Sequence, residues 1–567
     1  GNMESSGISN FDENGNPQTP AQITTTFAYN LLDMVTSITE PISIGLSRTT
    51  TFGYDRLFRP VETILPEDNR SATDFDELNR AIKSYFGFDG GNVPKAGALI
   101  QGESYFDLNS NTVRSVDGRG NDSHAYFDAF DRLIKVEDRL ATNPNYTELA
   151  YNRAGGVVSA KRFGRKRQFT APATWSWSGP GQLLAHSETF YDNLGRAYLS
   201  RVLAQTRTGL GLSYSMDETR TNFQFGWSTS RVKFRSNGQV EQTLDDLSYL
   251  TTYSYDAYNR LASVTDDQFT ASPDVNTNEY AYDANGNLVA QTARLFDQVE
   301  QSQRALTTQF FYDSLNRMTR ELAPVLASGE QYERTWRYDS RGHLVKAVDR
   351  RGSVRRYEYD LLGRGTRAKL EDVVRRRVNP ATGLVSPTTE HIVSRTLYDK
   401  NSNVIQSIDP TGNATSNRYD LAHRWLQTEF ADAAIPGSGI GLKRSAGSSH
   451  TLNLVGGGPF YAPAAGNAYD GNSNLLNTID PNGTVVTRTF DANDLPLTET
   501  ANTSSVPTAF GMTGESGALL EFDGLYRLGY ARSDDPSVSG GVATETSFAH
   551  NTLGETEIDF SRVYTSG

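Results

Sequence analysis

The feature that most constrains the fold is a repeat of 21 residues that opens on an aromatic residue followed by Asp or a near variant. Six intervals between successive openings have this same length: 54 to 75, 106 to 127, 234 to 255, 338 to 359, 398 to 419 and 469 to 490. Six equal intervals do not arise by chance. A small repeating unit therefore organises the chain.

Each repeat contains two turns and two runs of strand length. In residues 469–490, YDGNSNLLNTIDPNGTVVTRTF, turn-forming residues occupy 470–474 and 480–483. Asp, Asn, Gly and Pro supply the backbone angles and local hydrogen bonds that tight turns need. Leu475 and Ile479 are four positions apart, so both face one side of an extended strand. The pattern predicts an antiparallel meander with two strands per repeat.

The aromatic–Asp pairs are predicted to be structural. Aromatic residues also stand at alternate positions before the Asp, as in Tyr253 and Tyr255, and we expect these rings to stack as a ladder on one face of the sheet. The Asp side chain is expected to bond within the turn. The pairs singled out are Tyr255–Asp256, Tyr282–Asp283, Tyr338–Asp339, Tyr359–Asp360, Tyr398–Asp399 and Tyr469–Asp470.

The number of repeats constrains the overall shape. About 20 repeats give roughly forty strands and, at ~4.8 Å per strand, a ribbon ~190 Å long. Strand twist prevents an open sheet of this size from staying flat, so it must coil or close. Hydrophobic residues make up 37% of the sequence and the mean hydropathy is −0.53, which suits a thin layer. The predicted fold is all-β: a continuous antiparallel β-hairpin ribbon spiralled into a large hollow barrel or shell.

The chain is predicted to be one array over residues 1–567. Wider gaps between repeats indicate inserted loops near 152–190, 365–397, 430–468 and 500–520. The repeat resumes after each gap, so no domain boundary is expected.

Composition excludes several classes of function. The net charge of −13 argues against a general nucleic-acid binder. The absence of cysteine excludes disulfides and thiolate metal sites. No run of 18 apolar residues is present, so no membrane span is expected.

The Asp-x-Asn-x-Asn turns resemble the first three ligand positions of a calcium loop. Such a loop also needs a bidentate Glu at its twelfth position. In the five copies that position holds Ile23, Gly118, Arg294, Pro410 and Pro481. A structural turn is therefore favoured, with calcium binding as the alternative. The histidines form no pair with metal-ligand spacing, and we predict no metal, cofactor or catalytic residue.

Trp175 and Trp177, in the segment ATWSWSGPG, would share one face of an extended chain. Two indoles on one face could stack on a sugar ring, so both residues are candidate glycan contacts. The basic runs at 161–167, 350–356 and 375–377 could add contacts to an anionic polymer. Packing of the insertion against the shell is the favoured alternative for the tryptophans, and a solvated face for the basic runs.

The repeat resembles that of the RHS/YD-repeat proteins, whose motif is Tyr-Asp followed by x-x-Gly-Arg or x-x-Gly-Asn-Leu. It is matched at 191–196, 282–288, 338–344 and 359–364. The resemblance implies a ribbon of β-hairpins spiralling into a hollow shell. In bacterial toxin complexes and polymorphic toxins such a shell encloses a toxic segment, and in teneurin-like surface proteins it serves adhesion. The Gly/Asn/Tyr-rich core region of the bacterial shells has no counterpart in this sequence.

From this resemblance we expect a non-enzymatic scaffold of a secreted or bacterial cell-surface polypeptide. Its partners would be an attached, toxin-like cargo or other segments of the parent protein. A carbohydrate-binding or adhesion module that contacts cell-surface glycans is the alternative. A polysaccharide-degrading enzyme is a weaker one, because neighbouring acidic residues such as Asp245 and Asp246 point to opposite faces of a strand.

Overall fold

The computed structural model describes residues 2–89, 98–138, 144–165, 167–170, 174–177, 179–203, 206–207, 214–215, 227–246, 248–267, 276–297, 302–326, 328–378, 385–430, 460–461, 469–479, 485–502, 517–523, 525–534, 542–550 and 556–563. All regular elements in these ranges are β-strands. None of the described segments forms a helix that is long and apolar enough to cross a membrane.

The first strands, up to the insertion after residue 203, are β1 (Ser5–Phe11), β2 (Pro17–Tyr29), β3 (Val35–Ser43), β4 (Leu46–Tyr54), β5 (Pro60–Ile64), β6 (Arg70–Phe75), β7 (Ala81–Phe88), β8 (Leu99–Phe106), β9 (Thr112–Asp117), β10 (Asp122–Phe127), β11 (Leu133–Glu137), β12 (Tyr146–Tyr151), β13 (Val157–Gly164), β14 (Arg167–Thr170), β15 (Thr174–Trp177), β16 (Gln182–Tyr191) and β17 (Ala197–Leu203).

The next strands are β18 (Thr206–Arg207), β19 (Tyr214–Ser215), β20 (Trp227–Phe234), β21 (Val240–Leu244), β22 (Leu250–Tyr255), β23 (Leu261–Asp267), β24 (Asn276–Tyr282), β25 (Leu288–Asp297), β26 (Ser302–Tyr312), β27 (Met318–Leu322), β28 (Glu333–Tyr338), β29 (Leu344–Val348), β30 (Val354–Tyr359), β31 (Gly365–Val378), β32 (Val385–Tyr398), β33 (Val404–Ile408), β34 (Ala414–Tyr419), β35 (Trp425–Phe430) and β36 (Phe460–Tyr461). The last are β37 (Asn477–Ile479), β38 (Val485–Phe490), β39 (Pro496–Asn502), β40 (Gly517–Phe522), β41 (Leu528–Asp534), β42 (Val542–His550) and β43 (Thr556–Val563).

The strands pair antiparallel with their neighbours in sequence, from β1 with β2 to β35 with β36 and again from β37 to β43. The sheet continues across two insertions, because β13 pairs with β16 and β17 pairs with β20. Small separate hairpins, β14–β15 and β18–β19, form within them. The remaining described strands make up sheets of 32 and 7 strands.

A β-bulge recurs at the aromatic residue that opens each repeat. The register shifts between Ser254 and Tyr255, where Tyr255 pairs with Leu261, and it shifts at Tyr282 and Tyr338 in the same way. A bulge bends its strand and increases the local right-handed twist. One bulge in each repeat gives a long ribbon a cumulative twist and bend, which favours coiling.

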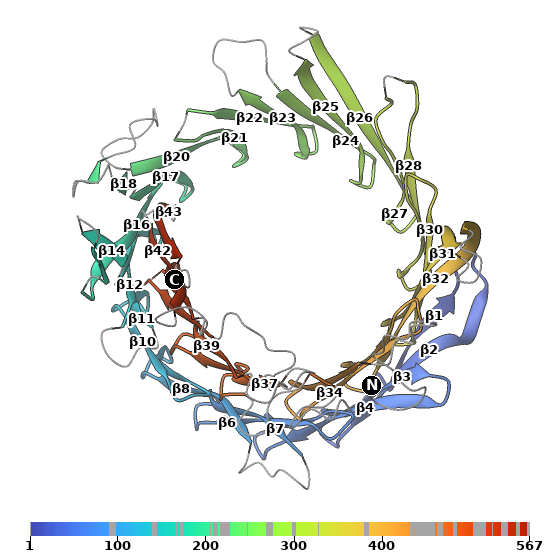
Figure 1. The fold of residues 1–567 in the computed structure, drawn as a ribbon, viewed down its shortest axis with the longest axis horizontal. Coiled ribbons are helices and arrows are strands. Elements are labelled where there is room, and N and C mark those ends of the chain that lie inside the picture. The colour runs from blue at the N-terminus through green and yellow to red at the C-terminus, as the bar shows by residue number, and fades with distance from the viewer. Residues whose placement is uncertain are drawn as a thin grey trace.

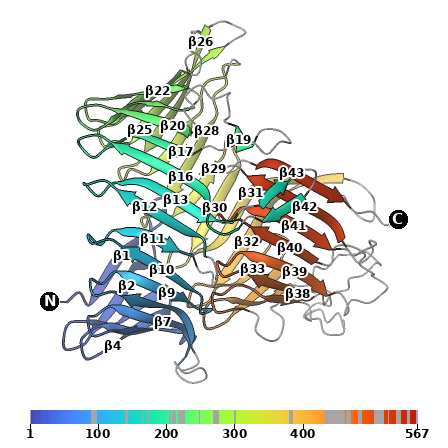
Figure 2. The same ribbon diagram turned by 90° about the vertical axis from the view of Figure 1, so that its left-hand side faces the viewer.

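The ribbon runs around an open centre and then passes beside its own beginning (Figure 1). We call β1–β27 the first coil and β28–β43 the second coil. The Ser340 amide donates to the Phe11 carbonyl oxygen at 3.2 Å, and the Asn69 side chain donates to the Leu421 carbonyl oxygen at 2.8 Å. The partners of these two bonds are 329 and 352 positions apart in the sequence. One full coil therefore contains about that many residues. Figure 2 shows the second coil along one end of the first. The predicted fold, a coiled hairpin ribbon, is confirmed.

The sheet is a single layer with few buried apolar side chains. The buried hydrophobic residues in the described part of the chain are Ile23, Ile42, Ala72, Phe88, Leu184 and Ala323. Such a small set does not form a conventional core. Contacts between neighbouring hairpins and between coils therefore have an important part in holding the fold together.

Two of the expected inserted loops are strands instead. The segment near 365–397 forms β31 and β32, each 14 residues long, which pair from Arg367 with Arg395 out to Val378 with Val385. The hairpin is lengthened, and this widens the gap between aromatic–Asp pairs without adding a loop. The segment near 152–190 contains β13 to β16. Most of 430–468 and of 500–520 lies outside the described residues.

Candidate functional site

The two edges of the ribbon carry different turns. We call the edge that carries the turns after the aromatic–Asp strands, from β2 onward, the YD edge; the turn after Phe11 and Asp12, which follows β1, lies at the opposite edge. It includes 30–34, 55–59, 76–80, 107–111, 128–132, 192–196, 256–260, 283–287 and 313–317 in the first coil and 339–343, 360–364, 399–403, 420–424, 470–474, 491–495 and 523–527 in the second. The opposite edge includes the turns at 12–16, 65–69, 117–121, 349–353 and 409–413.

Asp256 shows how the Asp of a repeat fixes its turn. Its Oδ1 accepts hydrogen bonds from the amides of Tyr258 and Arg260, both at 2.9 Å. Its Oδ2 accepts one from Nε of Arg260 at 2.7 Å. Asn259 has a φ of 64°, which few residues other than Asn and Gly adopt without strain. One carboxylate thus shapes the turn and orients the arginine.

That arginine and the tyrosine of the next repeat bind neighbouring hairpins together. Nη1 of Arg260 donates to the Asp283 carbonyl oxygen at 2.9 Å, and its guanidinium lies 4.7 Å from the ring centre of Tyr282. The Tyr282 hydroxyl in turn donates to the Leu261 carbonyl oxygen at 2.9 Å. The same tyrosine–carbonyl bond is made by Tyr255, Tyr338, Tyr359, Tyr398 and Tyr469.

In place of the ring-on-ring ladder predicted from the sequence, the aromatic residue that opens a repeat here contacts the guanidinium group of the preceding repeat. Equivalent arginine–ring pairs are Arg59–Phe75, Arg80–Phe106, Arg132–Tyr151, Arg196–Phe234, Arg317–Tyr338, Arg364–Tyr398 and Arg424–Tyr469. Sequence reasoning missed the role of the arginine, although Arg recurs four positions after the Asp.

The Asp-x-Asn-x-Asn turns use their carboxylates in the same way. Oδ1 of Asp283 accepts from the amides of Asn285 and Asn287 at 2.9 and 2.8 Å, and Oδ2 accepts from the Asn287 side chain at 2.9 Å. The bond from Asn287 holds the pKa of Asp283 below its ordinary value. Both oxygens of the Asp283 carboxylate therefore accept hydrogen bonds from the turn itself. Within the described ranges no three His, Asp or Glu residues gather as metal ligands.

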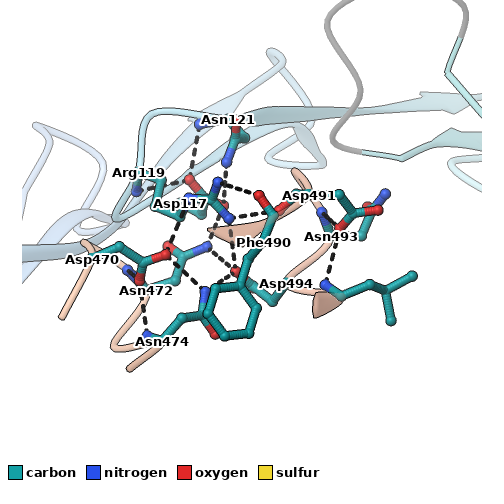
Figure 3. A network of polar contacts seen from close by, with 11 residues as sticks. Asp117, Arg119, Asn121, Asp470, Asn472, Asn474, Phe490, Asp491, Asn493 and Asp494 are labelled. Atoms are coloured by element: carbon teal, nitrogen blue, oxygen red, sulfur yellow. Dashed lines mark hydrogen bonds and ion pairs between the residues drawn. The ribbon is translucent and has the colours of Figure 1, made fainter. Parts of the chain in front are cut away.

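The two coils meet along a seam in which the YD edge of the second coil rests on the opposite edge of the first. Figure 3 shows a network of polar contacts in this seam. Arg119 donates to the carbonyl oxygen of Asp491 at 2.6 Å and lies 3.4 Å from the carboxylates of Asp470 and Asp494. The Asn472 side chain donates from Nδ2 to Oδ2 of Asp117 at 2.7 Å. One cation thereby joins two second-coil turns to one first-coil turn.

Two glycines allow the coils to approach this closely. Gly118 and Gly471 face each other, and a Cβ on either one would collide with the backbone carbonyl of the other. No side chain rotation could relieve that collision, because the obstructing atoms belong to the backbone.

A second cluster closes the seam further along. The Tyr526 hydroxyl donates to Oδ2 of Asp138 at 2.6 Å, and Asp138 also pairs with Arg162, whose side chain is 14% exposed. Burial and the bond to Asp138 raise the pKa of Tyr526 to about 12. Asp138 and Arg162 belong to the first coil and Tyr526 to the second, so the buried ion pair receives its third partner from across the seam.

Trp177 also contacts the second coil. Its indole nitrogen donates to Oε2 of Glu521 at 2.6 Å, and the guanidinium of Arg165 lies 4.7 Å from its ring centre. These contacts favour packing of the insertion against the shell over a free platform for a sugar. The side chain of Trp175 lies outside the described residues.

Residues 228–378 match the family model described as Teneurin YD-shell. The solved Tc holotoxin pore of Photorhabdus luminescens is 11% identical, covering 96% of this chain and 30% of its own, with a TM-score of 0.49. A crystal structure of TcdB2-TccC3 is also 11% identical, covering 97% of this chain and 35% of its own, with a TM-score of 0.33. The chain thus spans about a third of those chains. No protein of curated function matches it.

The Asp–Arg–Tyr contacts described above run through residues 228–378 and continue on both sides of them, from Arg59 to Tyr469. Residues 228–378 are therefore similar to a YD-shell, and the repeat geometry on both sides of them is of the same kind.

Proposed function

We propose that this chain is a structural scaffold that forms part of a hollow β-shell. The shell encapsulates or presents an attached, toxin-like segment of a longer secreted or cell-surface polypeptide. The observation that carries this proposal is the single-layered ribbon coiled around an open centre (Figure 1). Few apolar side chains are buried in the described part of the chain, which supports an inner face that is free to enclose another segment.

The chain is proposed to act without catalysis. The carboxylates that recur along it accept turn hydrogen bonds and pair with arginines, as Asp256 does with Arg260. These contacts favour the ionised form of a carboxyl group, whereas a catalytic acid needs its pKa raised. The recurring carboxylates therefore have a sufficient structural explanation.

The proposal is tested by fusing an unfolded, protease-sensitive reporter after Gly567 and following its digestion. We expect the fused reporter to be digested several-fold more slowly than the same reporter free in solution. A fusion that also carries Gly471→Ala and Arg119→Ala should lose this protection, because both changes weaken the seam. Equal digestion of the fused and free reporters would contradict encapsulation.

A further inference from the structure

A cavity of about 620 Å³ lies at the seam, between one turn of the first coil and two repeats of the second. Glu67 and Asn69 line it from the first coil, and residues of 399–405 and 417–421 line it from the second. Its volume is in the range of pockets that bind ligands. Both of its walls belong to coils that already meet, so the cavity does not depend on a free edge of the ribbon.

The outer hairpin β14–β15 shows which face of the sheet this cavity belongs to. Strand β14 contacts β42 and lies farther from the open centre than β42 (Figure 1). Trp177 of β15 donates to Glu521, so Glu521 points away from the centre and Phe522 beside it points toward the centre, since side chains alternate along a strand. Tyr419 has the place of Phe522 in its own repeat. Tyr419 and Asn417, two residues before it, therefore line the cavity from the face toward the open centre.

Asn401 brings an unsatisfied hydrogen-bond acceptor to the cavity wall. A chain of bonds across the seam fixes the orientation of its side-chain amide. Nδ2 of Asn69 donates to the Leu421 carbonyl oxygen at 2.8 Å, and Oδ1 of Asn69 accepts from Nδ2 of Asn401 at 2.6 Å. Oδ1 of Asn401 is buried, and no described residue donates to it. Burying such an atom costs free energy, so a ligand that supplies a donor there would be stabilised.

Asn417 offers the complementary donor in the same cavity. Its Nδ2 donates to the Val404 carbonyl oxygen at 3.1 Å, and its Oδ1 accepts from the Thr428 hydroxyl at 2.6 Å. A side-chain amide nitrogen carries two hydrogens. One N–H of Asn417 therefore remains for a carbonyl oxygen of a ligand.

The carboxylates that the second coil supplies do not make this cavity a cation site. Both oxygens of Asp399 accept from Asn403, Oδ1 from its amide at 2.8 Å and Oδ2 from its side chain at 2.7 Å. Asp420 accepts in the same way from the amide and Nε of Arg424, at 2.9 and 2.8 Å. The groups that remain are an acceptor and a donor on amide side chains, which match the N–H and C=O of a peptide unit.

We propose that this cavity binds an extended stretch of the enclosed polypeptide through its backbone. A peptide N–H donates to Oδ1 of Asn401, and a peptide carbonyl oxygen accepts from the side chain of Asn417. Because the recognised groups belong to the backbone, binding depends little on the sequence of the enclosed segment. The proposal rests on the encapsulation proposed above, and it adds a place on the wall where the segment is held.

Disulfide trapping tests this contact, because the chain has no cysteine of its own. The full chain carries Ile405→Cys in the cavity wall, and an unfolded reporter with one cysteine is fused after Gly567. We expect a disulfide to form between the two cysteines under mild oxidation. Asn401→Leu and Asn417→Leu should each slow its formation several-fold, because each removes a hydrogen bond to the peptide backbone without filling the cavity.

The matched control is Asn472→Leu. Asn472 has the place of Asn401 in its own YD turn and also bonds across the seam, to Asp117 at 2.7 Å, but it lies outside this cavity. This control should leave the rate of disulfide formation unchanged. Circular dichroism confirms that each variant is folded.

Digestion of the reporter is followed in the same fusions and separates this proposal from encapsulation itself. A reporter that stays protected from protease, but forms the disulfide equally fast in Asn401→Leu and Asn472→Leu, would overturn the cavity contact and leave encapsulation standing. A protected reporter that forms no disulfide would do the same. A reporter that is digested as fast as its free form would overturn both proposals.

Discussion

The guanidinium of Arg119 donates a hydrogen bond to the carbonyl oxygen of Asp491, 372 positions further along the chain. Both ends of this bond lie in turns, and neither lies in a strand that pairs with the other. The described parts of the two coils meet mainly through turns such as these, whereas their strands form sheet ladders only with strands close to them in sequence. A change in a seam turn should loosen the coil and leave the hairpins intact.

Arg119→Ala should weaken the seam. It removes hydrogen bonds to the carbonyl oxygens of Asp491 and Phe490 and the ion pairs with Asp470 and Asp494. Hydrogen bonds that involve a charged group contribute about 1.5–3 kcal/mol each when buried. We expect a local loss within that range, measured as faster amide hydrogen exchange in 470–474 and 491–495 with little change in 256–260.

The control for this variant is Arg114→Ala. Arg114 pairs with Asp122 inside one hairpin, at 41% exposure, so its loss should cost about 0–1 kcal/mol and leave exchange at the seam unchanged. Equal effects of the two variants would show that Arg119 acts as an ordinary surface charge.

Gly471→Ala should force the coils apart at the same place. The added methyl group would collide with the backbone of Gly118, and overpacking of this kind typically costs about 1–3 kcal/mol. Limited proteolysis should then cut the seam turns sooner than in the wild type. Gly179→Ala is the matched control, because a Cβ at that glycine would meet no atom within 4 Å. Unchanged cleavage in Gly471→Ala would contradict the close approach of the coils.

Arg260→Lys tests the ladder between hairpins. Lysine keeps the charge, but a single ammonium group does not reproduce the planar fork that bonds Asp256, reaches the Asp283 carbonyl and stacks on Tyr282. We expect a loss of about 1 kcal/mol, read from hydrogen exchange in β22 to β25. Arg294→Lys alters a pair whose partners are 43% and 42% exposed, so its effect should stay within about 0.5 kcal/mol.

The hairpins could be predicted from the sequence because their determinants are local. The turn of Asp256 to Arg260 is specified by five consecutive residues, and its partner hairpin lies about 20 positions away. The arginines that contact the rings are equally local determinants, because each stands four positions after the Asp of its own turn.

The seam could not be predicted, because its pairs depend on the circumference of the coil. Arg119 meets Asp491 only because one coil takes roughly that many residues, and small changes in twist at each bulge add up over many strands. The sequence predicts a loop where β31 and β32 lie for a related reason: a wider gap between repeats does not distinguish a longer hairpin from an insertion.

The shell should lose stability in acid. The hydrogen bond from the Arg132 side chain lowers the pKa of Asp128, and bonds from Thr411 and Asn413 lower the pKa of Asp409 from 3.8 to about 2. A carboxyl with a lower pKa in the folded chain is protonated first in the unfolded chain. Its stabilising contribution is therefore complete above the unfolded value of 3.8 and is lost as the pH falls through about 2.

Because such carboxylates recur in most turns, the thermal unfolding midpoint should be level from pH 7 down to about 5 and then fall steeply toward pH 2. The variant Asp409→Asn keeps an oxygen that accepts the turn amides but does not titrate. It should unfold more easily than the wild type at pH 7, and the difference should shrink as the pH approaches 2, where Asp409 itself becomes protonated. An unfolding midpoint that stays constant between pH 5 and 2 would show that the ionised turn carboxylates do not stabilise the folded chain.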